Sequence, residues 1–282
     1  MRIVLPEAVA SRAADVASGR EPAVPLSPAS TVVLLRTAPS GGLEAYLQRR
    51  HTGLAFAGGM FAFPGGRVDA ADSAFPDVLW HGPSPTEVGA RLGHTDAERV
   101  RAHVVAVVRE LFEETGVLLA APRPGVVGPR RPTETERSAL SGGASLAHVL
   151  EHLSCRLDAT LLRPWAQWLT PRFERRRFDT WFFVAALPDG QRPRVATEEA
   201  HEGRWVTPLE AIDDMRAGRL PMLPPTWWTL RELAAFPDVA SVLESAPSIA
   251  RYTVGWTLDG DDTVMVLPDD PRYPGDDPRE GT

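Results

Sequence analysis

The feature that most constrains this chain is a group of acidic residues near the end of a long predicted helix. At about 100° per residue, Glu110, Glu113 and Glu114 fall within an arc of roughly 100°, and apolar residues fall on the opposite side. The apolar stripe predicts a helix that packs against a core. Three neighbouring carboxylates repel one another unless a cation lies among them. The alternative is an ordinary solvated acidic face, which is common on amphipathic helices.

Both ends of this helix are marked in the sequence. Thr95 and Glu98 fit a capping box with Thr95 as N-cap, and Gly116 suits the left-handed position after the last turn. We therefore expect a helix from about Asp96 to Thr115. His103 lies inside it, where a surface or packing role is expected. Because Mg²⁺ and Mn²⁺ favour oxygen ligands, a carboxylate cluster of this kind indicates a hard divalent cation.

A glycine turn lies upstream of the helix. In Phe63-Pro64-Gly65-Gly66, two glycines let the backbone approach a ligand closely or adopt positive φ. Turn and helix together resemble the Nudix box, which reads Gly, five residues, Glu, seven residues, then Arg-Glu-apolar-x-Glu-Glu-x-Gly-apolar. Gly66 fits the first glycine and residues 109–117 fit the whole second half, whereas Asp72 stands where the family has Glu.

The box is split. Thirty-six residues, from 73 to 108, stand where the family has seven, so the box carries 29 extra residues. The inserted part, at about 73–95, predicts an irregular lobe with one short helix. A split box is similar to the branch of Nudix hydrolases that includes peroxisomal coenzyme A diphosphatase. Gly59 also fits a coenzyme A motif of that branch, but Ala55 stands where that motif has Arg.

The resemblance implies a fold and a chemistry. The implied fold is an α/β/α sandwich with a mixed central β-sheet and additional helices. The implied reaction is metal-dependent hydrolysis of the diphosphate linkage of a nucleoside diphosphate derivative, such as coenzyme A or an acyl-CoA. Alternatives are an ADP-ribose, NADH or nucleotide-sugar pyrophosphatase, or a non-catalytic module that senses a nucleotide.

The resemblance also implies roles for individual residues. Mg²⁺ or Mn²⁺ would be held by Glu110, Glu113 and Glu114, with the Gly66 region supplying a backbone carbonyl. The base that activates water would be Glu110, or a later acid, Glu199 or Glu202. Arg109 lies four residues before Glu113 and is expected to orient the cluster by ion pairing.

Arginines are the candidate phosphate ligands. The segment from Pro171 to Arg177 is strongly basic, and Arg176 and Arg177 are able to hold phosphates by bidentate contacts. The alternative is a solvated loop that pairs with nearby acids. Arg50, at the end of a predicted strand, is the third candidate for substrate binding.

Composition bounds the remaining functions. A net charge of −7 argues against bulk nucleic-acid binding. The chain contains no run of 18 apolar residues, so no membrane span is predicted. The early charge in the first ten residues argues against a secretory signal, so we expect a cytoplasmic protein. The single cysteine, Cys155, excludes an internal disulfide. Tryptophans taken to be exposed, together with the inserted lobe, are compatible with a homodimer.

The rest of the chain predicts one elaborated domain at 30–257, an N-terminal extension at 1–29 and an acidic tail at 258–282. Thr226 is the expected cap of a late helix, whose two tryptophans are expected in a core or interface. The other predicted elements are a hairpin at 31–36 and 43–50, strands at 117–121, 161–169 and 178–187, and helices at 133–140, 145–157 and 208–218.

Overall fold

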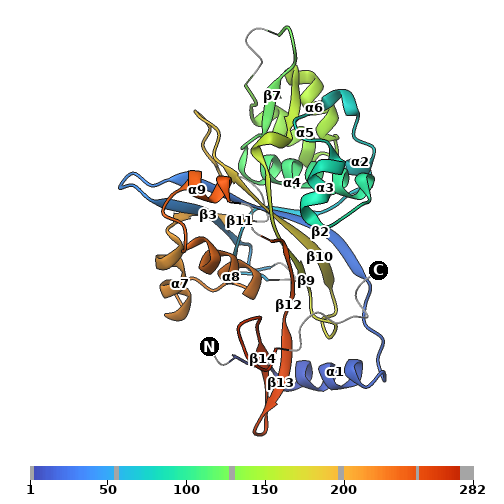
Figure 1. The fold of residues 1–282 in the computed structure, drawn as a ribbon, viewed down its shortest axis with the longest axis vertical. Coiled ribbons are helices and arrows are strands. Elements are labelled where there is room, and N and C mark those ends of the chain that lie inside the picture. The colour runs from blue at the N-terminus through green and yellow to red at the C-terminus, as the bar shows by residue number, and fades with distance from the viewer. Residues whose placement is uncertain (1–2, 54–56, 127–130, 196–199, 246–247, 274–282) are drawn as a thin grey trace. The chain divides into compact units, whose positions relative to one another are not determined.

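The computed structural model describes residues 3–53, 57–126, 131–195, 200–245 and 248–273 (Figure 1). Ala55 and Glu199 therefore lie outside the described residues. The chain divides into two compact units. The first comprises Met1–Pro28, Ala166–Thr180 and Ala250–Thr282, and the second comprises Ala29–Trp165 and Trp181–Ile249. In the described part, no helix combines the length and the apolar composition needed to cross a membrane.

The first unit is small and has its own sheet. Helix α1 (Glu7–Ala17) packs beside three strands in the order β1-β14-β13, and its core holds Leu5, Ala13 and Phe173. These strands are β1 (Ile3–Val4), β13 (Gly255–Asp259) and β14 (Asp262–Val266). A further strand, β12 (Ala250–Thr253), runs parallel to β9 (Arg163–Leu169).

The main sheet has the strand order β11-β3-β2-β10-β9-β12, with β4 on β3 and β5 on β2. It is mixed, because β3 pairs antiparallel with β2 and β11 while β12 is parallel to β9. The predicted hairpin is confirmed. The strands not yet given are β2 (Leu26–Thr37), β3 (Leu43–Arg50), β4 (Phe61–Ala62), β5 (Gly65–Arg67), β10 (Arg177–Ala186) and β11 (Ala200–Val206).

Both faces of this sheet are covered within the second unit. Successive residues of β2 point to opposite faces, and Val32, Val33, Leu34 and Leu35 are all fully buried. Val32 and Leu34 belong to the core that contains the valines of α4 (Ala97–Thr115). Helix α7 (Pro208–Arg216) contacts β3 and packs on α8 (Pro224–Leu233). A mixed sheet between helices is the predicted fold class.

Helix α4 forms where the apolar pattern places it. Its valines are buried, and Gly116 ends it with a φ of +73°, as expected. The predicted N-cap is wrong by one residue. Asp96, not Thr95, caps the helix, because its carboxylate accepts hydrogen bonds from the amides of Glu98 and Arg99, both at 3.1 Å.

The insertion is more regular than predicted. Helix α3 (Pro85–Leu92) is capped by Ser84, and α2 (Ala70–Ser73) and α3 both pack against α4. After the 3₁₀ turn η1 (Asp77–Leu79), strand β6 (Trp80–His81) runs parallel to β8 (Cys155–Asp158). Strand β7 (Ala120–Pro122) pairs with the other edge of β8. The inserted lobe is therefore joined to a strand that lies beyond the box.

Two segments after α4 differ clearly from the sequence prediction in their bounds. The predicted strand at 117–121 is shorter and begins at Ala120. The predicted helix at 145–157 ends at Leu153, because Ser154 adopts a left-handed conformation with a φ of +57° and the chain then enters β8. The remaining helices are α5 (Glu134–Ser141), α6 (Leu146–Leu153), η2 (Ala159–Leu161) and α9 (Val239–Glu244).

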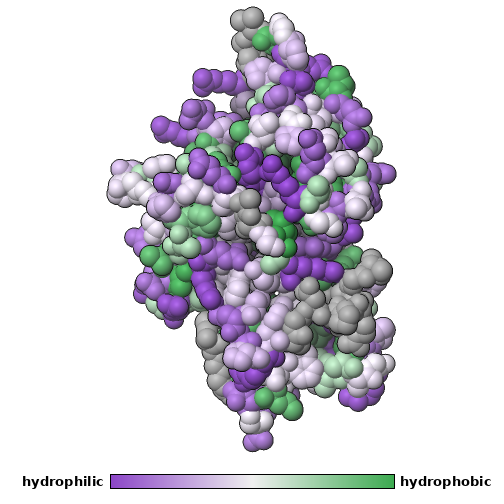
Figure 2. Space-filling model, in the orientation of Figure 1, coloured by the Kyte–Doolittle hydropathy of each residue, from purple (hydrophilic) through white to green (hydrophobic). Residues whose placement is uncertain are grey.

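The tryptophans lie mostly inside the protein. None of the eight is exposed, so the expectation of exposed tryptophans is wrong. Trp227 and Trp228 on α8 are 8% and 7% exposed, as expected for a core role. Thr226 lies inside α8 and is buried, and the N-cap position is Leu223. On the face seen in Figure 2, hydrophobic residues form separate spots among hydrophilic ones.

Candidate active site

The glycine turn lies directly against the acidic end of α4. Gly65 and Gly66 on β5 stand opposite Thr31 and Ser30 of β2. A Cβ atom on Gly66 would overlap the carboxylate of Glu110, and one on Gly65 would overlap the carbonyl oxygen of Ser30. A side chain at position 65 is therefore excluded by the backbone, whereas one at position 66 would displace the Glu110 carboxylate. The structure brings together Gly66 and Glu110, which are 44 residues apart in the sequence.

Glu114 is the most deeply buried of the three helix acids. It is 5% exposed, and its Oε2 accepts hydrogen bonds from Gln48 Nε2 at 2.5 Å and from the Gly65 amide at 3.0 Å. Burial, and then the charge of Glu110, raise the pKa of Glu114 to about 8. This carboxylate is held in one orientation in a place where a negative charge is costly without a cation.

Glu110 lies beside Glu114 and is also desolvated. Burial raises its pKa to about 7, against the opposing effect of Arg109, whose Nη1 donates to Glu110 Oε1 at 2.8 Å. The charges of Glu113 and Asp72 raise the pKa further. Glu113 is the most open of the three acids, with 26% of its side chain exposed, and it lies 3.9 Å from Arg109 Nη1.

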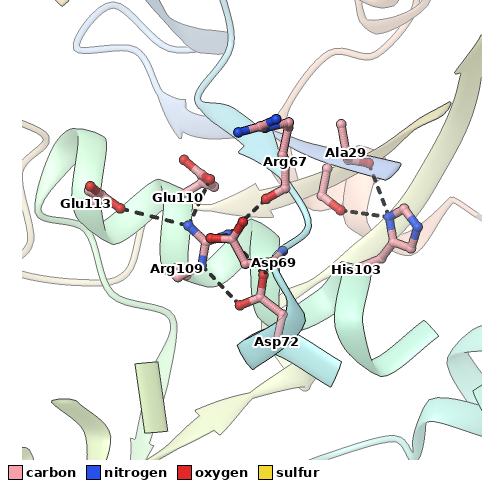
Figure 3. Close-up of polar contacts among 9 residues, drawn as sticks. Ala29, Arg67, Asp69, Asp72, His103, Arg109, Glu110 and Glu113 are labelled. Carbon is pink, nitrogen blue, oxygen red and sulfur yellow. Dashed lines mark hydrogen bonds and ion pairs between the residues drawn. The ribbon is translucent and has the colours of Figure 1, made fainter. Parts of the chain in front are cut away.

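Arg109 is the centre of the polar contacts in this region (Figure 3). Its Nε and Nη2 donate to the two oxygens of Asp72 at 3.0 and 2.9 Å, and Nη2 also donates to the carbonyl oxygen of Arg67 at 2.9 Å. Asp69 lies 3.5 Å away. Burial lowers the pKa of Arg109, but the hydrogen bonds to Asp72 and the charge of Glu110 outweigh it and raise that pKa. Arg109 therefore stays charged and fixes the helix against β5.

The donor set fits a hard divalent cation. Among the described residues, no group of three His, Cys, Asp or Glu side chains is spaced to hold an ion by itself. Mg²⁺ needs less, because it is usually held by one or two carboxylates with waters and substrate phosphates as its other ligands. Glu110 and Glu114 supply two such carboxylates, and the charge of Glu110 raises the cost of charging Glu114. A bound cation removes that cost.

Arg50, at the end of β3, faces the same acidic cluster. Residues 46, 48 and 50 of a strand point to one face, and Gln48 on that face contacts Glu114. The positive charge of Arg50 lowers the pKa of Glu114, opposing the effect of burial. The Arg50 Nε is buried and donates to no described residue. Arg50 thus brings an unused donor to the cluster.

Glu202 lies elsewhere. On β11 it stands opposite Arg49, the neighbour of Gln48, so it is on the sheet face away from Glu114. Its carboxylate pairs with Arg204 at 2.9 Å. The described contacts of Glu202 therefore argue against its expected role as base.

The basic segment at 171–177 belongs to the first unit. Arg176 is exposed there, whereas Arg177 is 5% exposed. Arg177 Nε donates to the carbonyl oxygens of Thr170 and Pro171, both at 3.1 Å, and its Nη1 donates to that of Val24 at 2.8 Å. The expectation of phosphate binding by Arg177 conflicts with this geometry, because its donors already hold the backbone.

Sequence reasoning missed Gln48. The signal for Gln48 was its place two residues before Arg50, on the same face of a predicted strand. Asp72, which stands where the family has Glu, has a structural role, because it binds Arg109 and accepts a hydrogen bond from the Asp69 amide at 2.8 Å. The shorter side chain reaches Arg109 because α2 packs directly on α4.

Comparison with known proteins gives a consistent result. Residues 26–233 match the family described as the NUDT19 Nudix domain. The human acyl-coenzyme A diphosphatase NUDT19 is 29% identical over 84% of this chain and 74% of its own length. The Xenopus laevis protein of the same name is 24% identical over 83% of this chain and 72% of its own.

A solved structure agrees with the fold. A Nudix hydrolase from Alicyclobacillus acidocaldarius superposes with a TM-score of 0.65 and 26% identity, covering 79% of this chain and 97% of the other. The family match spans well over half of the 282 residues and includes the glycine turn, the insertion and the carboxylate helix. The chain therefore belongs to the Nudix hydrolase family and carries the NUDT19 type of Nudix domain.

Proposed function

We propose that this Nudix hydrolase cleaves the diphosphate linkage of coenzyme A or of an acyl-CoA. The products would be a nucleotide and a 4′-phosphopantetheine fragment, acylated or not. The proposal is carried by one observation, the likeness to acyl-coenzyme A diphosphatases over more than four fifths of the chain. That likeness includes the split box, because the family match spans Gly65–Gly66 through Gly116.

We propose Mg²⁺ or Mn²⁺ as the cation. Glu114 and Glu110 would hold it, with Glu113 and the Gly66 carbonyl as further oxygen ligands. When bound, a divalent cation neutralises diphosphate oxygens and lowers the pKa of a coordinated water. Hydrogen bonds already orient the two carboxylates for such a cation, because Gly65 and Gln48 donate to Glu114 and Arg109 donates to Glu110.

Among the candidate bases, Glu110 has the best described position. Arg109 Nη1 holds one of its oxygens, Oε1, and with Glu110 acting as base, Oε2 would take the proton from the attacking water while Glu114 and Glu113 hold the cation. Its side chain is 16% exposed, so water can reach it. Glu202 lies on the other face of the sheet, and Glu199 stays a sequence prediction outside the described residues.

Arg50 is the proposed phosphate ligand. Its buried Nε donates to no described residue, and its charge acts on Glu114. A guanidinium at this place would bind a diphosphate oxygen and stabilise the charge that develops as the bond breaks. Arg176, which is exposed in the first unit, stays a sequence prediction for substrate binding.

The test is a substrate panel assayed with Mg²⁺ and with Mn²⁺. Coenzyme A, an acyl-CoA, ADP-ribose, NADH and a nucleotide sugar are incubated with the full chain, and the products are identified by mass spectrometry. We expect cleavage of coenzyme A or the acyl-CoA at kcat/KM at least about tenfold above the others, a difference of roughly 1.4 kcal/mol in transition-state binding. Preferred cleavage of ADP-ribose, NADH or the nucleotide sugar would contradict the substrate. Nucleotide binding without cleavage would indicate a sensing module instead.

A further inference from the structure

Strand β3 presents one polar face to the acidic end of α4. Tyr46, Gln48 and Arg50 alternate along the strand and therefore point to the same side of the sheet. All three interact with Glu114, by a hydrogen bond or through charge. Burial and then the charge of Glu114 raise the pKa of Tyr46 to about 12, Gln48 donates a hydrogen bond to Glu114, and the charge of Arg50 lowers the Glu114 pKa. The middle residue of this face, Gln48, orients Glu114 through its Nε2, and its other polar atom, Oε1, has no partner described so far.

The two hydrogen bonds to Glu114 fall on the same atom. Gln48 Nε2 and the Gly65 amide both donate to Oε2, at 2.5 and 3.0 Å. The other carboxylate oxygen, Oε1, is therefore the atom left to coordinate a cation. The orientation of the Gln48 amide is fixed by chemistry, because a carboxylate only accepts hydrogen bonds and the NH₂ group must face it.

The same orientation leaves Gln48 with an unmet acceptor. Its Oε1 is buried and accepts no hydrogen bond from any described residue. Gln48 as a whole is only 2% exposed, so bulk water does not reach this oxygen freely. A buried carbonyl without a donor is unfavourable, and such atoms are usually paired with a water or a ligand. No hydroxyl, amide or charged donor among the described residues fills this place.

We propose that Gln48 is a positioning residue for the metal site, in contact with a coordinated water. Its Nε2 holds Glu114 in the orientation that presents Oε1 to the cation, and its Oε1 accepts a hydrogen bond from a water bound to that cation. The inference rests on the proposed cation site and deepens it. Gln48 would thus act through Glu114 and a water, without being a ligand itself.

The test measures binding of Mn²⁺ to the full-length protein by electron paramagnetic resonance, in the absence of substrate. Gln48→Met keeps the length of the side chain and removes both hydrogen-bonding groups. We expect its Mn²⁺ dissociation constant to rise by on the order of 10- to 100-fold, as is typical when the partner of a metal ligand is removed. Gln48→Asn, which withdraws the amide by one methylene, should show a loss of the same kind.

A matched control comes from the first unit. Gln167 is a buried glutamine whose Nε2 donates to a buried carboxylate, Asp179, at 2.7 Å. Gln167→Met removes the same kind of hydrogen bond, and its Mn²⁺ affinity should equal that of the wild type. If folded Gln48→Met binds Mn²⁺ as tightly as the wild type, Gln48 serves packing alone and the inference is overturned.

A second measurement does not depend on any variant. In a crystal of the wild type soaked in Mn²⁺, a metal-bound water should lie roughly 2.6–3.2 Å from Gln48 Oε1. A bound Mn²⁺ with no water at that place would overturn the inference and leave the proposed function intact. A wild type that binds no Mn²⁺ in either experiment would instead overturn the proposed cation site, and with it the role of Gln48.

Discussion

Arg109 and Asp72 form a buried bidentate ion pair across the insertion that splits the box, with N–O distances of 3.0 and 2.9 Å. Asp72 is 2% exposed and Arg109 is 9% exposed. The pair joins α2 to α4 on one side of the inserted lobe. A single short carboxylate therefore maintains the geometry of a motif whose two halves are far apart in the sequence.

The first prediction concerns this pair. Asp72→Asn leaves Arg109 charged and without its main partner, and breaking a buried ion pair in this way costs about 3 kcal/mol of unfolding free energy. Turnover should fall as well, because Arg109 also orients Glu110. Urea unfolding measures the change in stability, and initial rates measure the change in turnover.

The control is Asp213→Asn, which removes the partner of Arg216 in an ion pair that is about 70% exposed. It should change stability by less than about 0.5 kcal/mol. Equal effects of the two substitutions would contradict the account.

The second prediction concerns the glycine turn. Gly66→Ala places a methyl group in the space of the Glu110 carboxylate, which must move. A displacement of about 1 Å of a catalytic group typically costs on the order of 100-fold in rate. We expect that loss in kcat with the protein still folded by circular dichroism. Gly53→Ala is the control, since Gly53 is exposed and a Cβ there meets only the ring of His51. Full activity of Gly66→Ala would show that Glu110 need not occupy its present place.

The third prediction separates two neighbouring arginines. Arg177 donates to three backbone carbonyl oxygens and is buried, so Arg177→Ala should lower the unfolding free energy by about 3 kcal/mol. Arg176 is exposed, and Arg176→Ala should change stability by less than about 0.5 kcal/mol. Chemical unfolding of both variants provides the comparison. A stable Arg177→Ala with weakened substrate binding would restore the phosphate-binding role that the sequence suggested.

The fourth prediction concerns pH. His103 stacks on Trp181 with ring centroids 3.8 Å apart, and its Nδ1 lies 3.1 Å from the Ala29 carbonyl oxygen (Figure 3). Burial, and then the charge of Arg99, lower its pKa from 6.5 to about 3. The folded protein thus keeps His103 neutral, while the unfolded chain takes up a proton below pH 6.5. Stability contributed by this group is complete above pH 6.5 and is lost as the pH falls toward 3.

Urea unfolding at pH 7 and pH 5 measures this effect. His103 should account for about 2 kcal/mol of the stability lost between the two values, so His103→Gln should lose about that much less than the wild type. His148→Gln, which replaces an exposed histidine on α6, should keep the wild-type dependence. Identical losses in His103→Gln and the wild type would show that His103 is not held neutral.

Much of the fold could be predicted because it follows from local periodicity. The apolar stripe of α4, the continuous apolar run of β2 and the alternation of β3 identify these elements directly. The pairing of β6 with β8 could not be read in this way. It joins a two-residue strand to a segment 77 residues further on, and such a contact leaves no local pattern. The N-cap was misplaced because Thr95 and Asp96 are both good capping residues.

The site was partly predictable for the same reason. The three acids of α4 lie within one turn, so their proximity follows from helix geometry alone. The role of Gln48 depends on which face of β3 meets α4, and only the register of the sheet decides that. Charge also misled the prediction for Arg177, because an arginine can bind backbone carbonyls inside the protein as well as phosphates at its surface.

The central claim is that the carboxylates of α4 hold the cation on which diphosphate cleavage depends. The most direct measurement is the rate of product release from coenzyme A or an acyl-CoA by the wild type and by Glu114→Gln, each with Mn²⁺ and after thorough chelation. Glu151→Gln, at an exposed glutamate of α6, is the control. We predict that Glu114→Gln stays folded and loses about 100-fold or more in kcat, and that chelation stops the wild type. Wild-type turnover that survives chelation, or a fully active Glu114→Gln, would contradict the account.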